Sequence, residues 1–371
     1  MKLHFEKDLP LIENLHDLFL NNTPLLDVRA PVEFSQGAFD YSENSPLLSD
    51  EERHEIGIRY KDKGQDEAIN LAAELISDEI REKRTADWVN FISKYPESTL
   101  YCFRGGMRSK ITQQWIYEKT GIKYPRVKGG YKAMRRFLID NSERLIEETS
   151  FMLLGGSTGS GKTRLLKHVP KSLDLEGLAN HRGSAFGANA SPQPTQINFE
   201  NTMSVQQLKH EQAGYKTLLL EDEGRNIGGV HLPILLNEKM AKSPIILLKI
   251  SKEERLQTSM QEYAIDMLED FQNHYGEEAG FQYFREALLN SLDRIQKRLG
   301  GERHKTLRKI AVDSLDQHEK TGSPESHISW VTSLLVDYYD PMYNYQLDQK
   351  KDRIVFTGNQ DEVLEYFTSR S

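Results

Sequence analysis

Residues 150–163, with the sequence SFMLLGGSTGSGKT, decide the fold of the second half of the chain. Residues 151–154 are apolar and predict a buried strand over 150–154, and residues 156–163 fit the pattern G-x-x-x-x-G-K-[ST] in full. Residues 164–168, which follow, are predicted to form a helix. This order of strand, glycine loop and helix predicts a phosphate-binding loop in which backbone N–H groups converge on a diphosphate.

Within this loop, Lys162 is expected to neutralise phosphate charge, and the Thr163 hydroxyl to bind Mg²⁺ if a metal is used. A glycine turn without a ligand is the alternative, which the strand before the loop and the helix after it disfavour. What the diphosphate is attached to stays open. The residues predicted to bind the diphosphate are Gly156, Ser157, Gly159, Ser160, Gly161, Lys162 and Thr163.

Acidic residues follow a second apolar strand at residues 217–220. The sequence Glu221-Asp222-Glu223 resembles the acidic end of a Walker B strand, although one acid is usual there. Glu221 or Asp222 is therefore a candidate to orient Mg²⁺ or a base, and a cap of the next turn is the alternative role for one of the acids. Residues 250–255 follow a further strand in the manner of a kinase lid. ATP chemistry is thus open but not required.

The single cysteine lies in a second loop of chemical interest, CFRGGMRS at residues 102–109. The loop follows a short apolar strand and leads into a helix, so its backbone N–H groups are expected to form an anion-binding nest. Arg104 and Arg108 add positive charge, which favours a reactive thiolate at Cys102. An inert buried cysteine is the alternative. Cys102, Arg104 and Arg108 are the predicted catalytic residues.

Strands and helices alternate on both sides of residue 150. Predicted strands lie at residues 24–29, 99–102, 150–154, 217–220, 244–250 and 353–357. Helical spacing of apolar residues covers 66–95, 109–119 and most of 260–299, whereas 177–198 is polar and predicts a long functional loop. This alternation predicts parallel sheets in two α/β domains, 1–138 and 139–371, the second with a helical insertion and a C-terminal strand and helix.

Charge is distributed unevenly along the 371 residues. The 48 basic and 56 acidic residues give a net charge of −8, which argues against a general polyanion binder. Residues 101–140 nevertheless carry ten Lys or Arg against two acids, and residues 294–309 carry seven against one. Concentrated positive charge on an acidic protein predicts a localised anionic partner, although for the second stretch a solvated helix face is an equally good interpretation.

The composition excludes other classes of protein. No window approaches eighteen consecutive apolar residues, so a membrane span is not expected, and the acidic residues near the N-terminus do not suit a secretory signal. One cysteine excludes an internal disulfide and a zinc site of several thiolates. A reducing cytoplasm is the expected location.

The first domain resembles a known family. Residues 27–39, DVRAPVEFSQGAF, are similar to the opening signature of rhodanese-like domains, and with the Cys102 loop the resemblance covers most of residues 1–135. It implies that Asp27, Arg29 and Glu33 are structural. The chain departs from the family by lacking the usual histidine after Gly37 and by a C-x5-R spacing, one residue longer than in sulfurtransferases. The longer loop favours a phosphate-like substrate.

The whole chain resembles the tRNA 2-selenouridine synthase family, in which a rhodanese-like domain precedes a P-loop domain. Residues 174–187, DLEGLANHRGSAFG, and residues 221–228, EDEGRNIG, are similar to further signatures of that family. The resemblance implies replacement of the sulfur of wobble 2-thiouridine by selenium from selenophosphate, through an S-geranylated intermediate made from geranyl diphosphate. It implies the anticodon arm of tRNA as partner, and a selenophosphate-producing enzyme as another.

Under this resemblance, the two polar signatures and the first basic window acquire expected roles. Residues expected to contact the substrate are Asn180, His181, Arg182, Ser184 and Arg225. His181 is a candidate general acid or base, with a solvated loop histidine as the alternative. Residues expected to bind tRNA phosphates are Arg126, Lys128, Lys132, Arg135 and Arg136.

Two other classes of function stay open at this point. A P-loop NTP-dependent phosphotransferase with an accessory rhodanese-like anion-binding domain predicts nucleotide chemistry that needs Lys162 but not Cys102. A non-catalytic module that binds tRNA or phosphoproteins predicts that Cys102→Ser keeps all function. A Cdc25-type phosphatase is disfavoured, because no general acid is visible near Cys102.

Overall fold

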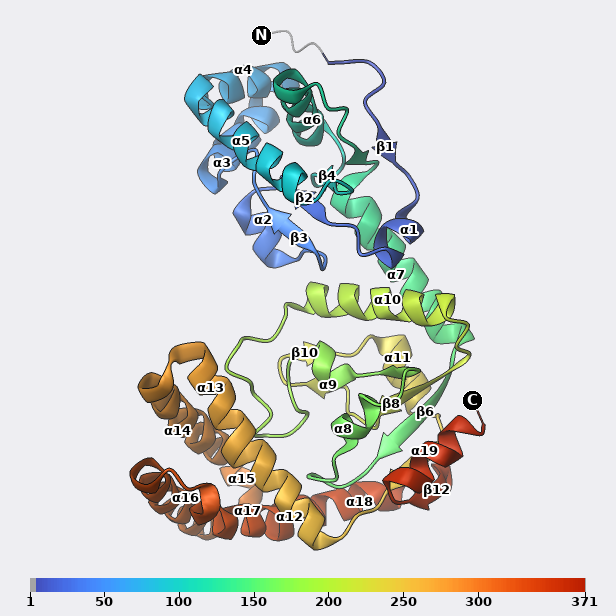
Figure 1. Cartoon of the computed structure of the whole chain (residues 1–371), viewed down its shortest axis with the longest axis vertical. Helices are drawn as coiled ribbons and strands as arrows, with labels where there is room; N and C mark the ends of the chain where they lie inside the picture. The colour runs from blue at the N-terminus through green and yellow to red at the C-terminus, as the bar shows by residue number, and fades with distance from the viewer. Residues whose placement is uncertain (1–4, 371) are drawn as a thin grey trace. The chain divides into compact units, whose positions relative to one another are not determined.

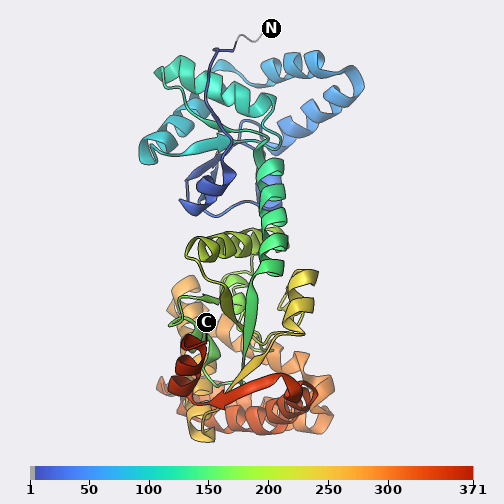
Figure 2. The ribbon, with the colours of Figure 1, turned by 90° about the vertical axis from the view of Figure 1, so that its right-hand side faces the viewer.

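Parallel strands form the centre of both halves of the chain, as the alternation of strands and helices predicted. The computed structural model describes residues 5–370. Unit 1 extends to Arg144 and includes Thr195–Lys209, whereas unit 2 contains Leu145–Pro194 and the chain from His210 onward. The predicted boundary after residue 138 lies within α7 (Gly130–Glu148), a continuous helix that leads into β6 (Figure 2).

Unit 1 contains a five-stranded sheet in the order β1-β5-β4-β2-β3, with every pair parallel. Its strands are β1 (Leu11–Ile12), β2 (Leu25–Asp27), β3 (Ser42–Asn44), β4 (Thr99–Tyr101) and β5 (Arg126–Val127). Its helices are α1 (Leu15–Leu20), α2 (Pro31–Gln36), α3 (Asp50–Lys63), α4 (Gln65–Leu75), α5 (Asp78–Lys94), α6 (Met107–Thr120) and α7. The predicted strands at 24–29 and 99–102 thus correspond to β2 and β4, next to each other in the sheet.

The helical periodicity at residues 66–95 covers two helices rather than one. The chain is extended at Ile76, and Ser77 caps α5 by accepting a hydrogen bond from the Ile80 N–H. The helix α5 ends before Pro96, as its position predicted. The core of the unit includes Trp88 and Leu100, both fully buried, together with Cys102.

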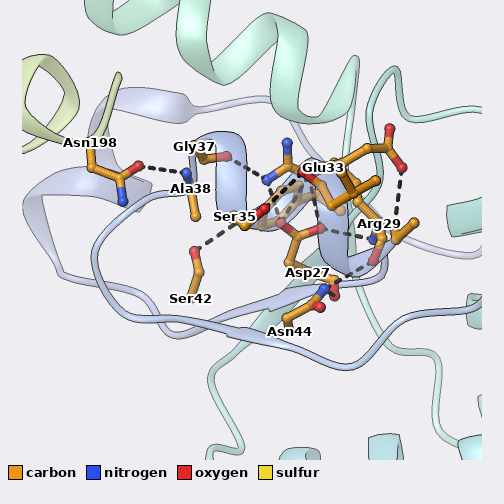
Figure 3. A network of polar contacts seen from close by, with 12 residues as sticks. Asp27, Arg29, Glu33, Ser35, Gly37, Ala38, Ser42, Asn44 and Asn198 are labelled. Carbon is orange, nitrogen blue, oxygen red and sulfur yellow. Dashed lines mark hydrogen bonds and ion pairs between the residues drawn. The ribbon is translucent and has the colours of Figure 1, made fainter. Parts of the chain in front are cut away.

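Residues 195–209, which the sequence analysis assigns to the second domain, cluster with unit 1. They form most of α10 (Gln196–Gln212). Side chains of this helix form hydrogen bonds with the backbone of the loop at Ala38 in unit 1. Asn198 accepts a hydrogen bond from the Ala38 N–H at 2.7 Å, and Asn201 donates one to the Ala38 carbonyl at 2.7 Å. Figure 3 shows Asn198 beside the polar network of Asp27 and Arg29. The sequence predicted only a polar loop up to residue 198, because these partners lie some 160 positions away.

Unit 2 contains a second five-stranded sheet in the order β12-β11-β6-β8-β7, again parallel throughout. Its strands are β6 (Ser150–Gly155), β7 (Ser172–Leu173), β8 (Thr217–Glu221), β11 (Ile245–Leu248) and β12 (Ile354–Gly358), with a separate hairpin of β9 (Asn226–Ile227) and β10 (Val230–His231). The strand order changes direction at β6, so the loop at its carboxyl end lies where open parallel sheets bind ligands.

Helices cover this sheet and form an additional helical part (Figure 1). Those near the sheet are α8 (Lys162–Leu166), α9 (Leu175–Leu178), α11 (Ile234–Met240) and α19 (Gln360–Thr368). The others are α12 (Lys252–Met260), η1 (Gln261–Asp266), α13 (Met267–Tyr275), α14 (Glu277–Arg294), α15 (Gln296–Leu299), α16 (Gly301–Thr321), η2 (Pro324–His327), α17 (Ile328–Leu334), η3 (Leu335–Tyr339), α18 (Asp340–Lys350) and η4 (Lys351–Arg353). The predicted helical insertion and C-terminal strand and helix are thus present.

The polar stretch after α9 is anchored in the core of the helical part. Phe186 is fully buried and packs between Tyr263 and Trp330, with ring centroids 5.6 and 5.8 Å away. The stretch 177–198, which its polar composition predicted to be a loop, therefore contributes the Phe186 side chain to the core. Among residues 5–370, no helix has the length and apolar character needed to cross a membrane.

Candidate functional site

The glycine loop of unit 2 adopts a conformation that only glycine accommodates at its tightest points. Gly159 and Gly161 have φ angles of +77° and +78°. A Cβ atom on Gly159 would lie 2.2 Å from the Ser259 hydroxyl and 2.9 Å from the Arg255 carbonyl oxygen. Arg255 also holds the loop through a hydrogen bond from its Nε to the Thr158 carbonyl. The loop is therefore fixed by α12, and its shape is set before a ligand arrives.

The two residues expected to act on phosphate occupy the start of α8. Lys162 donates a hydrogen bond from Nζ to the Gly156 carbonyl at 2.8 Å, and Thr163 donates one to the Glu176 carboxylate at 2.9 Å. Glu176 lies in the first turn of α9 and was not singled out from the sequence. Its position in the 174–187 signature was the one available signal. A hydroxyl beside a carboxylate is a suitable oxygen donor set for Mg²⁺.

The acids at the end of β8 have three different environments. Glu221 is fully buried and accepts a hydrogen bond from the Leu175 N–H, and burial raises its pKa well above the usual value. Asp222 forms an ion pair with Lys350 at 2.7 Å. Burial, together with the nearby Glu176 carboxylate, raises the pKa of Glu223 to about 8, although the charge of Lys162 opposes this shift. At neutral pH the cluster therefore retains a proton.

The glycine loop forms one side of a pocket of about 1150 Å³. Its lining includes Lys162, Thr163, Glu176, Asp222 and Glu223 from the sheet side. An apolar and aromatic wall from the helical part adds Tyr263, Ile295, Tyr338, Tyr339, Met342 and Tyr343. The hydroxyls of Tyr339 and Tyr343 are buried with no hydrogen-bond partner. Polar and apolar surfaces thus meet in one cavity large enough for a phosphorylated ligand of moderate size.

The 174–187 signature contributes part of the lining, but not every residue predicted from it. His181, Arg182 and Ser184 line the pocket. Burial lowers the pKa of His181, and the charge of Arg294 lowers it further, so the imidazole is neutral at neutral pH. Its Nδ1 accepts a hydrogen bond from the Gly183 N–H at 3.2 Å, which leaves a proton on Nε2.

Three predicted residues do not belong to that lining. Asn180 instead donates hydrogen bonds to Ser191 and Pro192 and accepts one from Asn189, so it holds the loop together. Arg225 is exposed on the segment before β9, and Ser157 contributes its carbonyl oxygen to the Ser160 N–H within the glycine loop. The positions of Asn180, Ser157 and Arg225 outside the pocket lining indicate a structural role for these residues and not a contact with the ligand.

The Cys102 loop of unit 1 is closed. Cys102 is 3% exposed, and its thiol donates a hydrogen bond to the Ser109 hydroxyl at 3.2 Å. The start of α7 lies against the loop, since a Cβ on Gly130 would be 2.1 Å from the Cys102 carbonyl oxygen. The structure places Cys102 directly after β4, in the loop that leads into α6, as predicted, but access to its sulfur requires movement of the loop.

Arg108, predicted to charge the anion nest, is paired with a carboxylate. Its guanidinium donates two hydrogen bonds to Glu33, and Arg53 lies 3.1 Å from the same carboxylate. Burial alone would raise the pKa of Glu33, but the hydrogen bonds and charge of Arg108 outweigh burial and lower it. Arg104 is exposed and stacks near Phe103. Asp27 and Arg29 form a fully buried ion pair, as expected of structural residues (Figure 3).

The residues predicted to bind tRNA in unit 1 are largely engaged within the unit. Arg126 donates to the Gly105 carbonyl at 2.8 Å and to Gln113 at 3.0 Å. Lys128 pairs with Glu13, Arg135 with Glu200, and Arg136 with Asp140. Lys132 is exposed. Five of the ten basic side chains in the window 101–140 therefore pair with carboxylates, and for four of them, Arg108, Lys119, Lys128 and Arg135, the partner is distant in sequence.

These features define a protein with a P-loop domain of the α/β class, built on a parallel sheet and completed by a helical part. A family model described as "tRNA 2-selenouridine synthase AAA domain" matches residues 149–371. This chain belongs to the tRNA 2-selenouridine synthase family, as its resemblance predicted.

Curated relatives match over nearly the whole chain. A tRNA 2-selenouridine synthase of Marinobacter nauticus is 50% identical over 362 residues, covering 98% of both chains. Proteins of the same name from Pseudomonas fluorescens and Bordetella petrii are 45% and 46% identical, over 97% and 95% of this chain and 98% and 94% of their own lengths. The N-terminal domain of a Clostridium difficile 630 protein named for ATP/GTP binding is 28% identical over 32% of this chain and 89% of its own, with a TM-score of 0.30, too low to support a structural argument.

Proposed function

We propose that this protein is a tRNA 2-selenouridine synthase that replaces the sulfur of wobble 2-thiouridine by selenium in two steps. The first is S-geranylation from geranyl diphosphate in the P-loop pocket, and the second is selenation from selenophosphate with Cys102. Membership of the family supports the overall reaction and tRNA as the substrate. The division into two steps comes from the family resemblance and from the chemistry of the two loops.

The observation that carries the first step is the meeting of a phosphate-binding loop with an apolar wall. Lys162 and the backbone N–H groups of the glycine loop suit a diphosphate. Ile295, Tyr338 and Met342 line the same pocket and suit a hydrocarbon chain. A prenyl diphosphate presents these two surfaces in one molecule, which favours it over inorganic diphosphate.

In this step the thiouridine sulfur attacks the first carbon of the geranyl chain, and the C–O bond to the diphosphate breaks. Lys162 stabilises the charge that grows on the departing diphosphate. Thr163 and Glu176 would hold Mg²⁺ if it is used, and the metal would supply further neutralisation of that charge. Alkylation releases the N3 proton of the base, and the neutral imidazole of His181 is the proposed acceptor, through its Nδ1 once this atom is released from the Gly183 N–H.

In the second step, the selenium of selenophosphate attacks C2 of the base, the C2–S bond breaks and geranylthiol leaves with a proton. Water then cleaves the P–Se bond, which releases phosphate and leaves the selenium on C2. Alkylation makes the sulfur a good leaving group. Cys102 lies at a loop built like an anion nest, which supports a role in handling selenophosphate. The 3% exposure of Cys102 means that this step needs loop movement.

The test is mass spectrometry of nucleosides from 2-thiouridine tRNA incubated with the protein, with and without each co-substrate. Lys162→Ala should abolish the geranylated nucleoside, whereas Lys242→Ala, which removes an exposed charge outside the pocket, should not. Cys102→Ala should abolish 2-selenouridine and leave the geranylated nucleoside to accumulate. Hydrolysis or transfer from ATP or GTP that depends on Lys162, without any thiouridine product, would instead support an NTP-dependent phosphotransferase.

A further inference from the structure

The second basic stretch, at residues 294–309, is not used by the proposed chemistry. The structure divides it into two groups. Arg294, Lys297 and Arg298 line the P-loop pocket and are exposed, and we refer to these three residues as the rim cations. Arg303, Lys305 and Lys309 lie on α16, are also exposed, and are not part of the lining. Three of the seven positive charges in residues 294–309 therefore lie at the pocket.

Arg294 and Arg298 donate their hydrogen bonds to neutral groups. Arg294 donates to the Ser291 hydroxyl at 2.7 Å and to the Ala185 carbonyl at 3.3 Å. Arg298 lies 4.0 Å from the sulfur of Met342. These contacts position the side chains without neutralising them. Arg308 and Lys305, in contrast, contact Asp293 and Glu302. Full positive charge is thus held at the pocket.

The charge exceeds what a diphosphate needs. Lys162 and the glycine loop already supply the donors that a P-loop uses for two phosphates. The three rim cations would therefore bind a second anion at the same pocket, one that carries several negative charges. An RNA backbone has this character, and its contacts with proteins are mainly to phosphates from Arg and Lys.

The contrast with unit 1 strengthens this interpretation. Lys128 and Arg136, from the basic window expected to bind tRNA, form ion pairs with Glu13 and Asp140 at 3.0 and 2.6 Å. A phosphate would have to displace these carboxylates before it could bind. At the rim cations a phosphate would displace only neutral partners or water, so the electrostatic gain is larger.

We propose that Arg294, Lys297 and Arg298 bind backbone phosphates of the substrate RNA and direct the nucleotide to be modified into the P-loop pocket. This inference rests on the proposed function. The apolar wall of the pocket adjoins the rim cations. Ile295 lies between Arg294 and Lys297 in the sequence, and it lines the same cavity as Tyr338 and Met342. A base that enters past the rim therefore meets aromatic surface on which it can stack.

The experiment compares two triple variants of the full chain with the wild type. The rim variant carries Arg294→Gln, Lys297→Gln and Arg298→Gln, and the control carries Arg303→Gln, Lys305→Gln and Lys309→Gln. Each loses three positive charges from exposed side chains. Binding of a labelled anticodon stem-loop containing 2-thiouridine is titrated over a range of salt concentrations, and binding of inorganic pyrophosphate is measured by calorimetry.

For the rim variant, the Kd for the stem-loop should rise about 10- to 100-fold at low salt, and the slope of log K against log salt should fall by about 2, since each lost phosphate contact removes about 0.7. Its Kd for pyrophosphate, and both constants of the control, should stay within about threefold of the wild type. Unchanged RNA binding by the rim variant would overturn the inference. So would an equal loss of pyrophosphate binding, which would assign these cations to the diphosphate, or an equal loss of RNA binding by the control.

The same materials separate this inference from the proposed function. Wild-type protein that binds the stem-loop but leaves its thiouridine unchanged with both co-substrates contradicts the proposed function, whatever the rim variant does. Wild-type protein that makes the geranylated nucleoside, together with a rim variant that makes it at the same rate and the same RNA concentration dependence, contradicts only the role of the rim cations.

Discussion

The loop at Cys102 and the loop at Lys162 both follow a parallel strand and lead into a helix, β4 into α6 and β6 into α8. The first is closed, with a buried thiol and an arginine paired to Glu33. The second borders a large pocket with unpaired cations at its rim. The same order of strand, loop and helix therefore gives a closed loop in one case and a loop that borders an open pocket in the other, because a distant carboxylate pairs with the arginine of the first loop and the start of α7 covers its cysteine.

The largest expected effect concerns the backbone that closes the first loop. Gly130→Ala places a Cβ 2.1 Å from the Cys102 carbonyl oxygen, at a residue with φ of +59°. A clash with backbone cannot be relieved by a rotamer change, so the free energy of unfolding of unit 1 should fall by about 3 kcal/mol. Chemical denaturation followed by Trp88 and Trp115 fluorescence measures this.

The matched variant in the same unit is Gly121→Ala. Gly121 has the left-handed conformation, with φ of +72° and open space around it, so only the backbone strain of about 1 kcal/mol is expected. Equal losses for the two variants would mean that the start of α7 does not hold the Cys102 loop closed.

The second prediction tests closure at the sulfur itself. Because Cys102 is the one cysteine of the chain, alkylation by iodoacetamide reports on it alone. With 3% exposure, the thiol should react about 100-fold more slowly in the native protein than in the denatured chain. A rate that rises towards the denatured value when selenophosphate is added would show that the ligand opens the loop. Native reactivity equal to that of the denatured chain would contradict the closed state.

The sequence predicted the parts of this comparison that depend on neighbouring residues. The glycine loop, β6 before it and β8 with its acids follow from patterns within about ten residues, and the structure places them as expected. The parallel order of both sheets follows from the alternation of strands and helices.

What the sequence did not predict are pairings between distant positions. Glu33 and Arg108 are 75 positions apart, and no local pattern links them. The same holds for Glu176 with Thr163, whose spacing of 13 residues spans a strand and a turn. Net charge in a window counts side chains but not their partners, and for this reason the window at 101–140 suggested a stronger anion-binding surface than the structure provides.

The third prediction removes the neutralising charge from the first loop. Glu33→Gln leaves the half-buried Arg108 without its carboxylate, so unit 1 should lose about 1–3 kcal/mol of unfolding free energy. Alkylation of Cys102 should also become faster, because Arg108 no longer ties the loop to α2. The control is Glu13→Gln, which breaks the exposed pair with Lys128 and should cost less than about 0.5 kcal/mol. Similar losses of unfolding free energy for the two variants would mean that Glu33 stabilises unit 1 no more than an exposed acid does.

The smallest expected effect is a difference in the sign of the pH dependence. The pKa of folded Glu33 is lowered, so its contribution to stability is present above the unfolded pKa near 4.5 and is lost as the pH falls through the lowered value. The pKa of folded Glu223 is raised to about 8, so its contribution is present below the unfolded pKa and is lost as the pH rises from about 4.5 to 8.

Hydrogen exchange measured peptide by peptide between pH 5 and 8, corrected for intrinsic rates, separates these contributions. Protection around β8 and α9 should fall with rising pH by up to about 1.4 kcal/mol per pH unit for each proton held, and Glu223→Gln should reduce that slope, while the raised pKa of Glu221 retains part of it. Protection around α2 and α6 should not share it, because Glu33 is ionised throughout this range. A slope in both regions, unchanged in the variant, would mean that the proton is not held by the carboxylates beside Lys162, and that the two loops differ in access but not in charge.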